Sequence, residues 1–294
     1  MTLAGADELI AGVRAANDAG DYVELERRAQ ELLEASELVR DHAGIAAAHR
    51  YLGNARVVRR DVDGAEREYR IAQDLYEQLG DSVGVATCQL SLGNLELELR
   101  MNVIEARRYI EESLPTIRAF GRASHLAIAL GLLGEIARLE GDYDLSMMLS
   151  GEALDIFEDI GDRTRAGAEL LDIAHCRLLK RDYDSAKAVL ELAYGHLEPE
   201  SNPQRIATYF DLWFMFAVSV RCYDDGAQLY GFVEAFRARR NVPRLQNLMP
   251  WFSHAVEIIG MQLSPDEVAS ARARGSVLST GQARELAAKV GSAG

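Results

Sequence analysis

The sequence reads LGNAR at 52–56, LGNLE at 92–96 and LGEIA at 133–137, three versions of one short motif. The glycines of the motif, Gly53, Gly93 and Gly134, follow one another at intervals of 40 and 41 residues. A small or apolar residue recurs six times at the same 40- or 41-residue steps, at Leu25, Ala65, Ala106, Ser146, Ala186 and Ala227. Self-similarity at such a period is the signature of a repeat architecture, so six repeats are predicted.

Each repeat is predicted to be a pair of antiparallel helices. Apolar residues between the landmarks follow helical spacing, as Ala65, Tyr69 and Ala72 do, while charged residues occupy the other faces. Short segments such as GDYD at 141–144 and RDYD at 181–184 separate the two helices of a repeat. Connections this short place neighbouring helices antiparallel and in contact, which predicts an all-α fold.

Small residues and turn residues fit this arrangement. Two helices that cross closely need a small side chain at the crossing, and four positions meet that need: Gly53, Gly93, Gly134 and Ala174.

The loops between repeats read LGD at 79–81, FGR at 120–122 and IGD at 160–162. A glycine just after a helix can adopt the left-handed conformation, and the aspartate that follows can accept hydrogen bonds from the next helix. Asp81 and Asp162 are therefore predicted N-caps.

Composition excludes several classes of partner. Lys and Arg number 32 against 46 Asp and Glu, giving a net charge of -14, which repels nucleic acid at long range. The N-terminus is acidic where a signal peptide is basic, and no run approaches the roughly 20 apolar residues of a membrane span. The three cysteines, Cys88, Cys176 and Cys222, form no CxxC pair and are predicted to be thiols in a reducing compartment. A cytoplasmic protein with no direct nucleic-acid or membrane partner is expected.

Nothing in the sequence points to catalysis. The six histidines show no ligand spacing with one another or with the cysteines, and no GxSxG motif is present. Acidic pairs such as Glu111 and Glu112 are typical of solvated helix faces. We therefore expect a protein that is not an enzyme and that holds no cofactor and no metal.

The motif resembles the tetratricopeptide (TPR) consensus: a Leu-Gly pair, an alanine 12 residues on, then an aromatic residue and a second alanine. Leu52, Gly53, Ala65, Tyr69 and Ala72 carry the resemblance best, within a region of roughly residues 5–235. The period is longer than the 34-residue TPR form, and Glu77 stands where the family has a closing proline. The resemblance implies a right-handed α-solenoid of about six TPR-like helix pairs, with 1–240 forming the repeats and 241–294 forming C-terminal capping helices continuous with them.

The tail carries a second resemblance. After the Pro and Glu break EPESNP at 198–203, the segments LYGFVEAFR at 229–237, SPDEVASARARG at 264–275 and STGQARELAAKV at 279–290 follow one another. This order is similar to the end of the repeat region in LuxR-type, SARP-type and cyclase-fused bacterial regulators of the STAND class, in which the repeats receive a signal. Ser264 with Glu267 fits a capping box, and Ser279 or Thr280 is expected to cap the last helix. No GxxxxGK[ST] loop or helix-turn-helix is found, so the chain is either an excised sensor region or a stand-alone relative.

The candidate binding residues come from the TPR register. Asn54 and Asn94 follow the motif glycine, in a slot that faces the concave groove of TPR proteins, and Glu135 and His175 take the same slot in later repeats. An exposed polar residue with no binding role is an equally good interpretation of these positions. Arg50 is a further groove position, although Thr87 and Ser91 stand where a carboxylate clamp needs lysine and asparagine. The predicted groove residues are Arg50, Asn54, Asn94, Glu98, Glu135, Arg138, Asp172 and His175.

Two clusters near the tail have alternative interpretations. Tyr209, Phe210, Trp213, Phe214 and Phe216 cover more than one helix face, and burial under the tail helices is favoured over an apolar docking surface. Arg237, Arg239, Arg240 and Arg244 are interpreted as a solvated helix end, favoured over a site that grips a phosphate or an acidic motif.

The leading hypothesis is a non-catalytic sensor or interaction module of a bacterial signalling or transcription regulator, binding a protein, a peptide or a small-molecule signal. A stand-alone peptide receptor or co-chaperone-type adaptor is the alternative. An enzyme with its active site hidden in the groove is the third and least favoured class.

Overall fold

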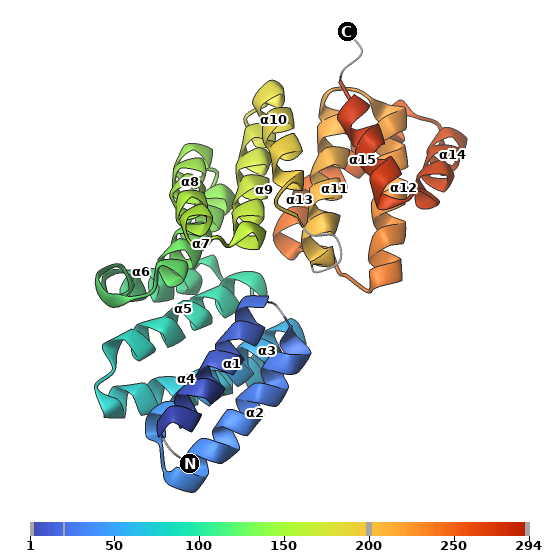
Figure 1. Cartoon of the computed structure of the whole chain (residues 1–294). Coiled ribbons are helices and arrows are strands. Elements are labelled where there is room, and N and C mark those ends of the chain that lie inside the picture. The colour runs from blue at the N-terminus through green and yellow to red at the C-terminus, as the bar shows by residue number, and fades with distance from the viewer. Residues whose placement is uncertain (1–2, 20, 198–201, 292–294) are drawn as a thin grey trace. The chain divides into compact units, whose positions relative to one another are not determined.

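The computed structural model describes residues 3–19, 21–197 and 202–291, and most of them lie in helices (Figure 1). No β-strand occurs within these ranges, which confirms the all-α prediction. Residues 198–201 of the predicted break lie outside the described residues. The helices are α1 (Leu3–Ala19), α2 (Tyr22–Val39), α3 (His42–Val58), α4 (Val62–Leu79), α5 (Ser82–Glu98), α6 (Val103–Phe120), α7 (Ala123–Glu140), α8 (Tyr143–Asp159), α9 (Arg163–Leu179), α10 (Tyr183–Tyr194), α11 (Pro203–Ser219), α12 (Tyr223–Arg240), the 3₁₀ helix η1 (Gln246–Leu248), α13 (Met249–Gln262), α14 (Pro265–Ser276) and α15 (Thr280–Lys289).

The helices pair as the period predicts. The second helix of each pair, namely α2, α4, α6, α8, α10 and α12, begins three or four residues before one of the six landmarks. Every landmark side chain is buried against its neighbours: Leu25, Ala65, Ala106, Ser146, Ala186 and Ala227. Among the described residues, α1–α12 therefore form six TPR-like helix pairs, as expected.

Small residues lie where the two helices of a pair cross. A Cβ added to Gly53 would lie 2.4 Å from the ring of Tyr69, and one added to Gly93 would lie 2.7 Å from Ile110. On Gly134 it would lie 3.3 Å from the carbonyl oxygen of Ser146. A side chain would clash at Gly53 and Gly93 and would force the neighbours of Gly134 to shift, so the repeated glycine is explained by helix packing.

The predicted turn chemistry holds at two of three loops. Asp81 accepts a hydrogen bond from the Gly84 N–H at 2.9 Å, and Asp162 accepts one from Arg165 at the same distance. The preceding Gly80 and Gly161 have φ of 69° and 75°, in the left-handed region. The expectation is wrong for Gly121, which has φ of -76° and whose N–H donates to the Ile117 carbonyl. Gly121 is required for space, because an added Cβ would lie 2.5 Å from that carbonyl oxygen.

The helices form two compact units, residues 1–133 (unit 1) and 134–294 (unit 2), with the boundary inside α7. In unit 1 the first helices of successive pairs contact one another, α1 with α3 and α3 with α5; in unit 2, α9 contacts α11. The first helices of each unit therefore form one layer. We call the side of the layer that carries the predicted groove residues the inner face of that unit. These residues are Arg50, Asn54, Asn94 and Glu98 in unit 1, and Glu135, Arg138, Asp172 and His175 in unit 2.

Unit 2 has an aromatic core under its tail. The side chains of the predicted aromatic cluster on α11 are all buried, which confirms burial over an exposed docking surface: Tyr209, Phe210, Trp213, Phe214 and Phe216. Helix α13 covers part of α11, with the rings of Phe214 and Phe252 4.9 Å apart.

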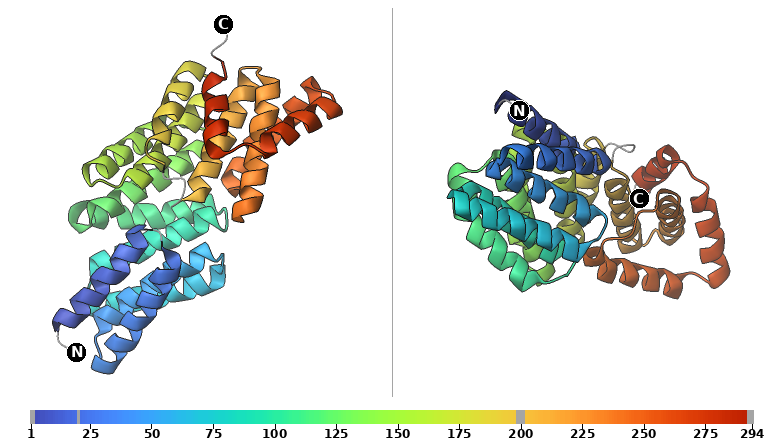
Figure 2. Two further views of the ribbon diagram at one scale, coloured as in Figure 1. Left: turned by 45° about the vertical axis from the view of Figure 1, so that its right-hand side comes forward. Right: turned by 90° about the horizontal axis from the view of Figure 1, so that it is seen from below.

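The last two helices, red in Figure 2, pack against α12. The backbones of α12 and α14 meet at two glycines, since a Cβ on Gly231 or on Gly275 would lie within 2.1 Å of the facing carbonyl oxygen. Ser264 with Glu267 and Ser279 with Gln282 form capping boxes, as predicted for the first pair and for the capping serine of the last helix. The division of the chain at residue 240 stays an interpretation of the sequence.

Candidate partner-binding site

The predicted groove residues all lie on first helices. Four belong to unit 1, namely Arg50 and Asn54 on α3 with Asn94 and Glu98 on α5. The other four belong to unit 2, namely Glu135 and Arg138 on α7 with Asp172 and His175 on α9.

In unit 1 the two asparagines of the inner face differ in whether their side chains are hydrogen-bonded. Asn54 accepts a hydrogen bond from the Tyr69 hydroxyl at 2.9 Å and donates to the Asn17 side chain at 2.8 Å. Its carboxamide therefore links α3 to α4 and α1. Asn94 is half-buried, and its carboxamide is not hydrogen-bonded to any described residue. Of the two asparagines predicted to bind a peptide, Asn94 is the one with its hydrogen-bonding groups available.

Arg50 lies half-buried among aromatic side chains. Its guanidinium stacks over the ring of Tyr51, 4.2 Å from the centroid, and makes no ion pair with any described carboxylate. Burial raises the pKa of the neighbouring Tyr76 and Cys88 to about 12, so both stay neutral at physiological pH. A positive charge without a carboxylate partner on this face suits an acidic or carbonyl oxygen of a ligand.

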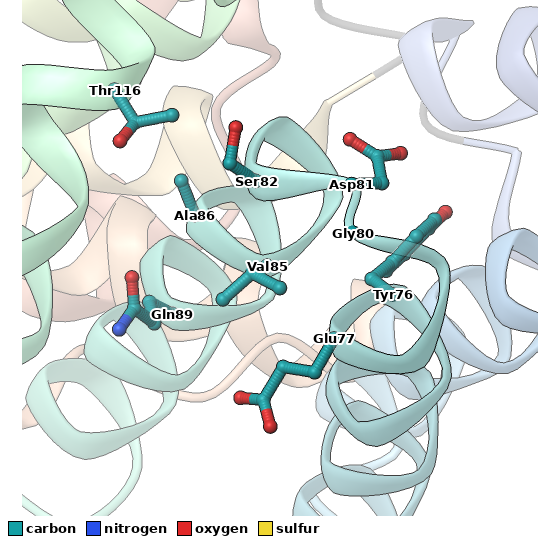
Figure 3. Close-up of a pocket in the computed structure, with 9 residues that line it drawn as sticks. All are labelled: Tyr76, Glu77, Gly80, Asp81, Ser82, Val85, Ala86, Gln89 and Thr116. Carbon is teal, nitrogen blue, oxygen red and sulfur yellow. The ribbon is translucent and has the colours of Figure 1, made fainter.

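Unit 1 also has a pocket of about 320 Å³ between the end of α4, the start of α5 and Thr116 of α6 (Figure 3). Its lining includes Glu77, Asp81 and Tyr76, and no basic side chain. The Asp81 carboxylate already caps α5. The pocket is a shallow recess of the turn, and none of the predicted groove residues lines it.

In unit 2 the inner face is a buried charged cluster. Arg138 is 2% exposed, and its Nη2 lies 3.7 Å from Asp172 Oδ1, which is an ion pair but too long for a hydrogen bond. The Nε and Nη1 of Arg138 are buried and have no hydrogen-bond partner among the described residues. His175 is equally buried, and its Nε2 is also without a partner.

Burial sets the protonation of this cluster. It raises the pKa of Asp172 to about 6, against the opposing effect of Arg138. It raises the pKa of Glu169 well above the usual range, and the nearby Asp172 adds to this shift. Burial and the charge of Arg138 lower the pKa of His175, which is neutral as a result. The cluster therefore presents both donors and acceptors at neutral pH.

The tail contributes two residues that the sequence did not reveal. The ring of Trp251 on α13 lies 4.8 Å from His175, at an interplanar angle of 87°, and 5.5 Å from the guanidinium of Arg138. The side-chain amide of Asn247 in η1 donates to Glu135. Both residues are more than 70 positions from Asp172 and His175 on α9. No periodicity connects them to these residues, so the sequence alone did not indicate the contact.

The structure corrects the interpretation of two arginines. Arg237 and Arg244 are not solvated, because both bind the fully buried Asp211: Arg237 through Nη2, and Arg244 through Nε at 3.2 Å and Nη2 at 2.9 Å. Arg239 is exposed, as expected, and donates to the Ser276 carbonyl. The pair anchors the segment after α12, since Arg237 also donates to the Pro243 carbonyl at 2.7 Å.

The described residues were also compared with the requirements of a metal site and of a membrane span. No group of three or more His, Cys, Asp or Glu side chains there is arranged to hold a metal ion. None of the helices described is long and apolar enough to cross a membrane. All three cysteines are free thiols; Cys88 and Cys176 are buried, and Cys222 is half-buried.

No protein-family model matches the chain, and no curated protein matches its sequence. Solved structures do match. The fold is TPR-like. BtubC (BKLC) from P. vanneervenii aligns at TM-score 0.56 and 16% identity, over 76% of this chain and 91% of that one. The apo form of RapI aligns at TM-score 0.54 and 11% identity, over 86% of this chain and 97% of that one.

A third match is a Signal Transduction ATPase with Numerous Domains (STAND) protein with a tetratricopeptide repeat sensor, from Pyrococcus horikoshii. It aligns at TM-score 0.52 and 15% identity over 86% of this chain, which spans 44% of that protein. At such identities the likeness shows the fold and nothing about ligands.

Proposed function

We propose that the chain is a non-catalytic binding module that recognises a protein or peptide partner on the inner faces of its helix pairs. The observation that carries the proposal is the set of polar atoms on these faces that have no hydrogen-bond partner among the described residues: the Asn94 carboxamide in unit 1, and Arg138 Nε and Nη1 with His175 Nε2 in unit 2. Unpartnered polar groups at partly buried positions are costly unless a ligand or water satisfies them. Helix-pair repeats use their concave surfaces for recognition.

We further propose that the module is the sensor of a bacterial signalling or transcription regulator. The tail segments at 229–237, 264–275 and 279–290, with their similarity to the ends of LuxR-type and SARP-type repeat regions, support this role. The fold likeness to a protein that is itself described as having a tetratricopeptide repeat sensor is consistent with it. The native gene tests the proposal: a nucleotide-binding switch domain in the same reading frame supports a sensor, whereas a 294-residue frame beside a secreted-peptide gene favours a stand-alone receptor.

Partner binding is tested by capturing the partner with the tagged chain and measuring its affinity by calorimetry. Asn94→Ala should weaken binding about 2- to 13-fold, because one net hydrogen bond contributes roughly 0.5–1.5 kcal/mol. Glu111→Ala, an exposed change on the second helix α6, is the matched control. Asn54 is a poor probe, since its bonds to Tyr69 and Asn17 hold the repeats together.

Wild-type affinity in Asn94→Ala and in Asp172→Ala, together with loss of binding in Glu111→Ala, would place the partner on the second helices and contradict the proposal.

A further inference from the structure

The buried guanidinium of Arg138 lacks an acceptor. An arginine is charged at every physiological pH, yet Arg138 is 2% exposed and two of its nitrogens donate to no described residue. Its one carboxylate partner, Asp172, stands 3.7 Å away, beyond hydrogen-bond distance. Leaving such donors unpaired is expensive, so an oxygen from outside the chain is expected to complete the site.

The surrounding charges favour a neutral ligand. Glu135 and Asp172 carry negative charge on this face, while Arg138 and Arg205 act on Asp172 with the opposite sign. Because two acids and two arginines surround this site, neither a carboxylate nor an ammonium ligand gains a net attraction from them. A group that carries an acceptor oxygen and N–H donors side by side meets both kinds of partner.

The chain itself already places one carboxamide on this face. The side-chain carboxamide of Asn247 reaches this face from the tail and donates to the Glu135 carboxylate. The indole of Trp251 lies over the Arg138 guanidinium and against His175. Trp251 is only half-buried, and the flat face of its ring can stack on a planar amide.

We propose that Arg138, Asp172 and Trp251 form a subsite for a primary carboxamide, the group on the asparagine and glutamine side chains of a peptide or protein. The carboxamide oxygen accepts from Arg138 Nε or Nη1, and its NH₂ donates to Asp172. This assignment rests on the proposed role of the inner face and names the chemistry that unit 2 recognises there.

Three small probes of similar size test the assignment: acetamide, N-methylacetamide and acetate. The chain contains two tryptophans, so its indole N–H groups give two NMR signals, and Trp251→Phe assigns them. Acetamide should shift the Trp251 signal saturably, and leave the signal of Trp213, which is 1% exposed, unchanged. N-methylacetamide and acetate should bind at least several-fold more weakly.

Variants test the role of the guanidinium. Arg138→Gln should weaken acetamide binding at least 10-fold, while Arg239→Gln, a change at an exposed arginine, should leave it unaltered. If Arg138→Gln fails to fold, the comparison of the three probes on the wild-type chain still decides.

Tighter binding of acetate would make this an anion site, equal binding of N-methylacetamide would make it a backbone-amide site, and no saturable shift with any probe would mean that water alone satisfies Arg138. Each result overturns the carboxamide assignment. None of them bears on the Asn94 measurement, so failure of the subsite is distinguishable from failure of the proposed function.

Discussion

Replacing Asp211 by asparagine tests whether buried charges hold the tail of unit 2 in place. The Asp211 carboxylate is 0% exposed and is contacted by the guanidinium groups of Arg237 and Arg244. Removing one member of a buried ion pair costs roughly 3–5 kcal/mol, because it leaves an uncompensated charge. Arg244 retains Glu234 at 2.8 Å, and Arg237 retains the Pro243 carbonyl at 2.7 Å. We therefore expect Asp211→Asn to lower the free energy of unfolding by about 3 kcal/mol, the lower end of that range.

Both tryptophans, Trp213 and Trp251, lie in unit 2, so their fluorescence during urea unfolding follows this unit. For a unit of this size about 3 kcal/mol corresponds to a fall in Tm of roughly 6–12 °C. Arg239→Gln, which loses only an exposed hydrogen bond to the Ser276 carbonyl, is the control and should cost about 1 kcal/mol or less. A loss below about 1 kcal/mol in Asp211→Asn would refute the reasoning, because the two arginines would then need no buried counter-charge.

Three further predictions concern stability. Gly134→Leu should cost about 1–3 kcal/mol, because the new side chain meets Ser146 at the crossing of α7 and α8; an unchanged melting temperature would show that the crossing is loose. Asp81→Ala should cost about 1 kcal/mol by removing the cap of α5, and the same urea titration followed by circular dichroism measures it. The pKa of His175 is lowered well below 6.5, so the unfolded chain takes up this proton first, and His175 by itself removes up to about 1.4 kcal/mol of stability per pH unit as pH falls below 6.5. His175→Gln should flatten that slope while the exposed His254→Gln keeps it; equal slopes in all three proteins would contradict the neutral, buried state of His175.

The repeats were predictable because their causes are local and periodic. Gly53, Gly93 and Gly134 recur since each pair of helices crosses at the same point, and Asp81 and Asp162 cap helices three residues from the N–H groups they bind. Each of these signals depends only on residues within one repeat. It can therefore be recognised in a single sequence.

The chemistry of unit 2 was less predictable because it depends on distant residues. Arg237 was interpreted as solvated, since its partner Asp211 lies 26 positions earlier on another helix. Asn247 meets Glu135 across 112 positions. The register of the repeats predicted that Arg138 and His175 lie on the inner face. Their deep burial goes with the contact of α13 against that face through Trp251, and no periodicity in the sequence predicts this contact.

The most direct test of partner binding on the inner faces is site-specific photo-crosslinking of the captured partner. A photoreactive amino acid is placed at Asn94 or Asp172, on first helices, and at Glu111 or Asp155, exposed on the second helices α6 and α8. The account predicts covalent adducts from positions 94 and 172 and none from 111 and 155. Adducts from positions 111 and 155 alone would contradict this account and would indicate that the partner binds the second helices.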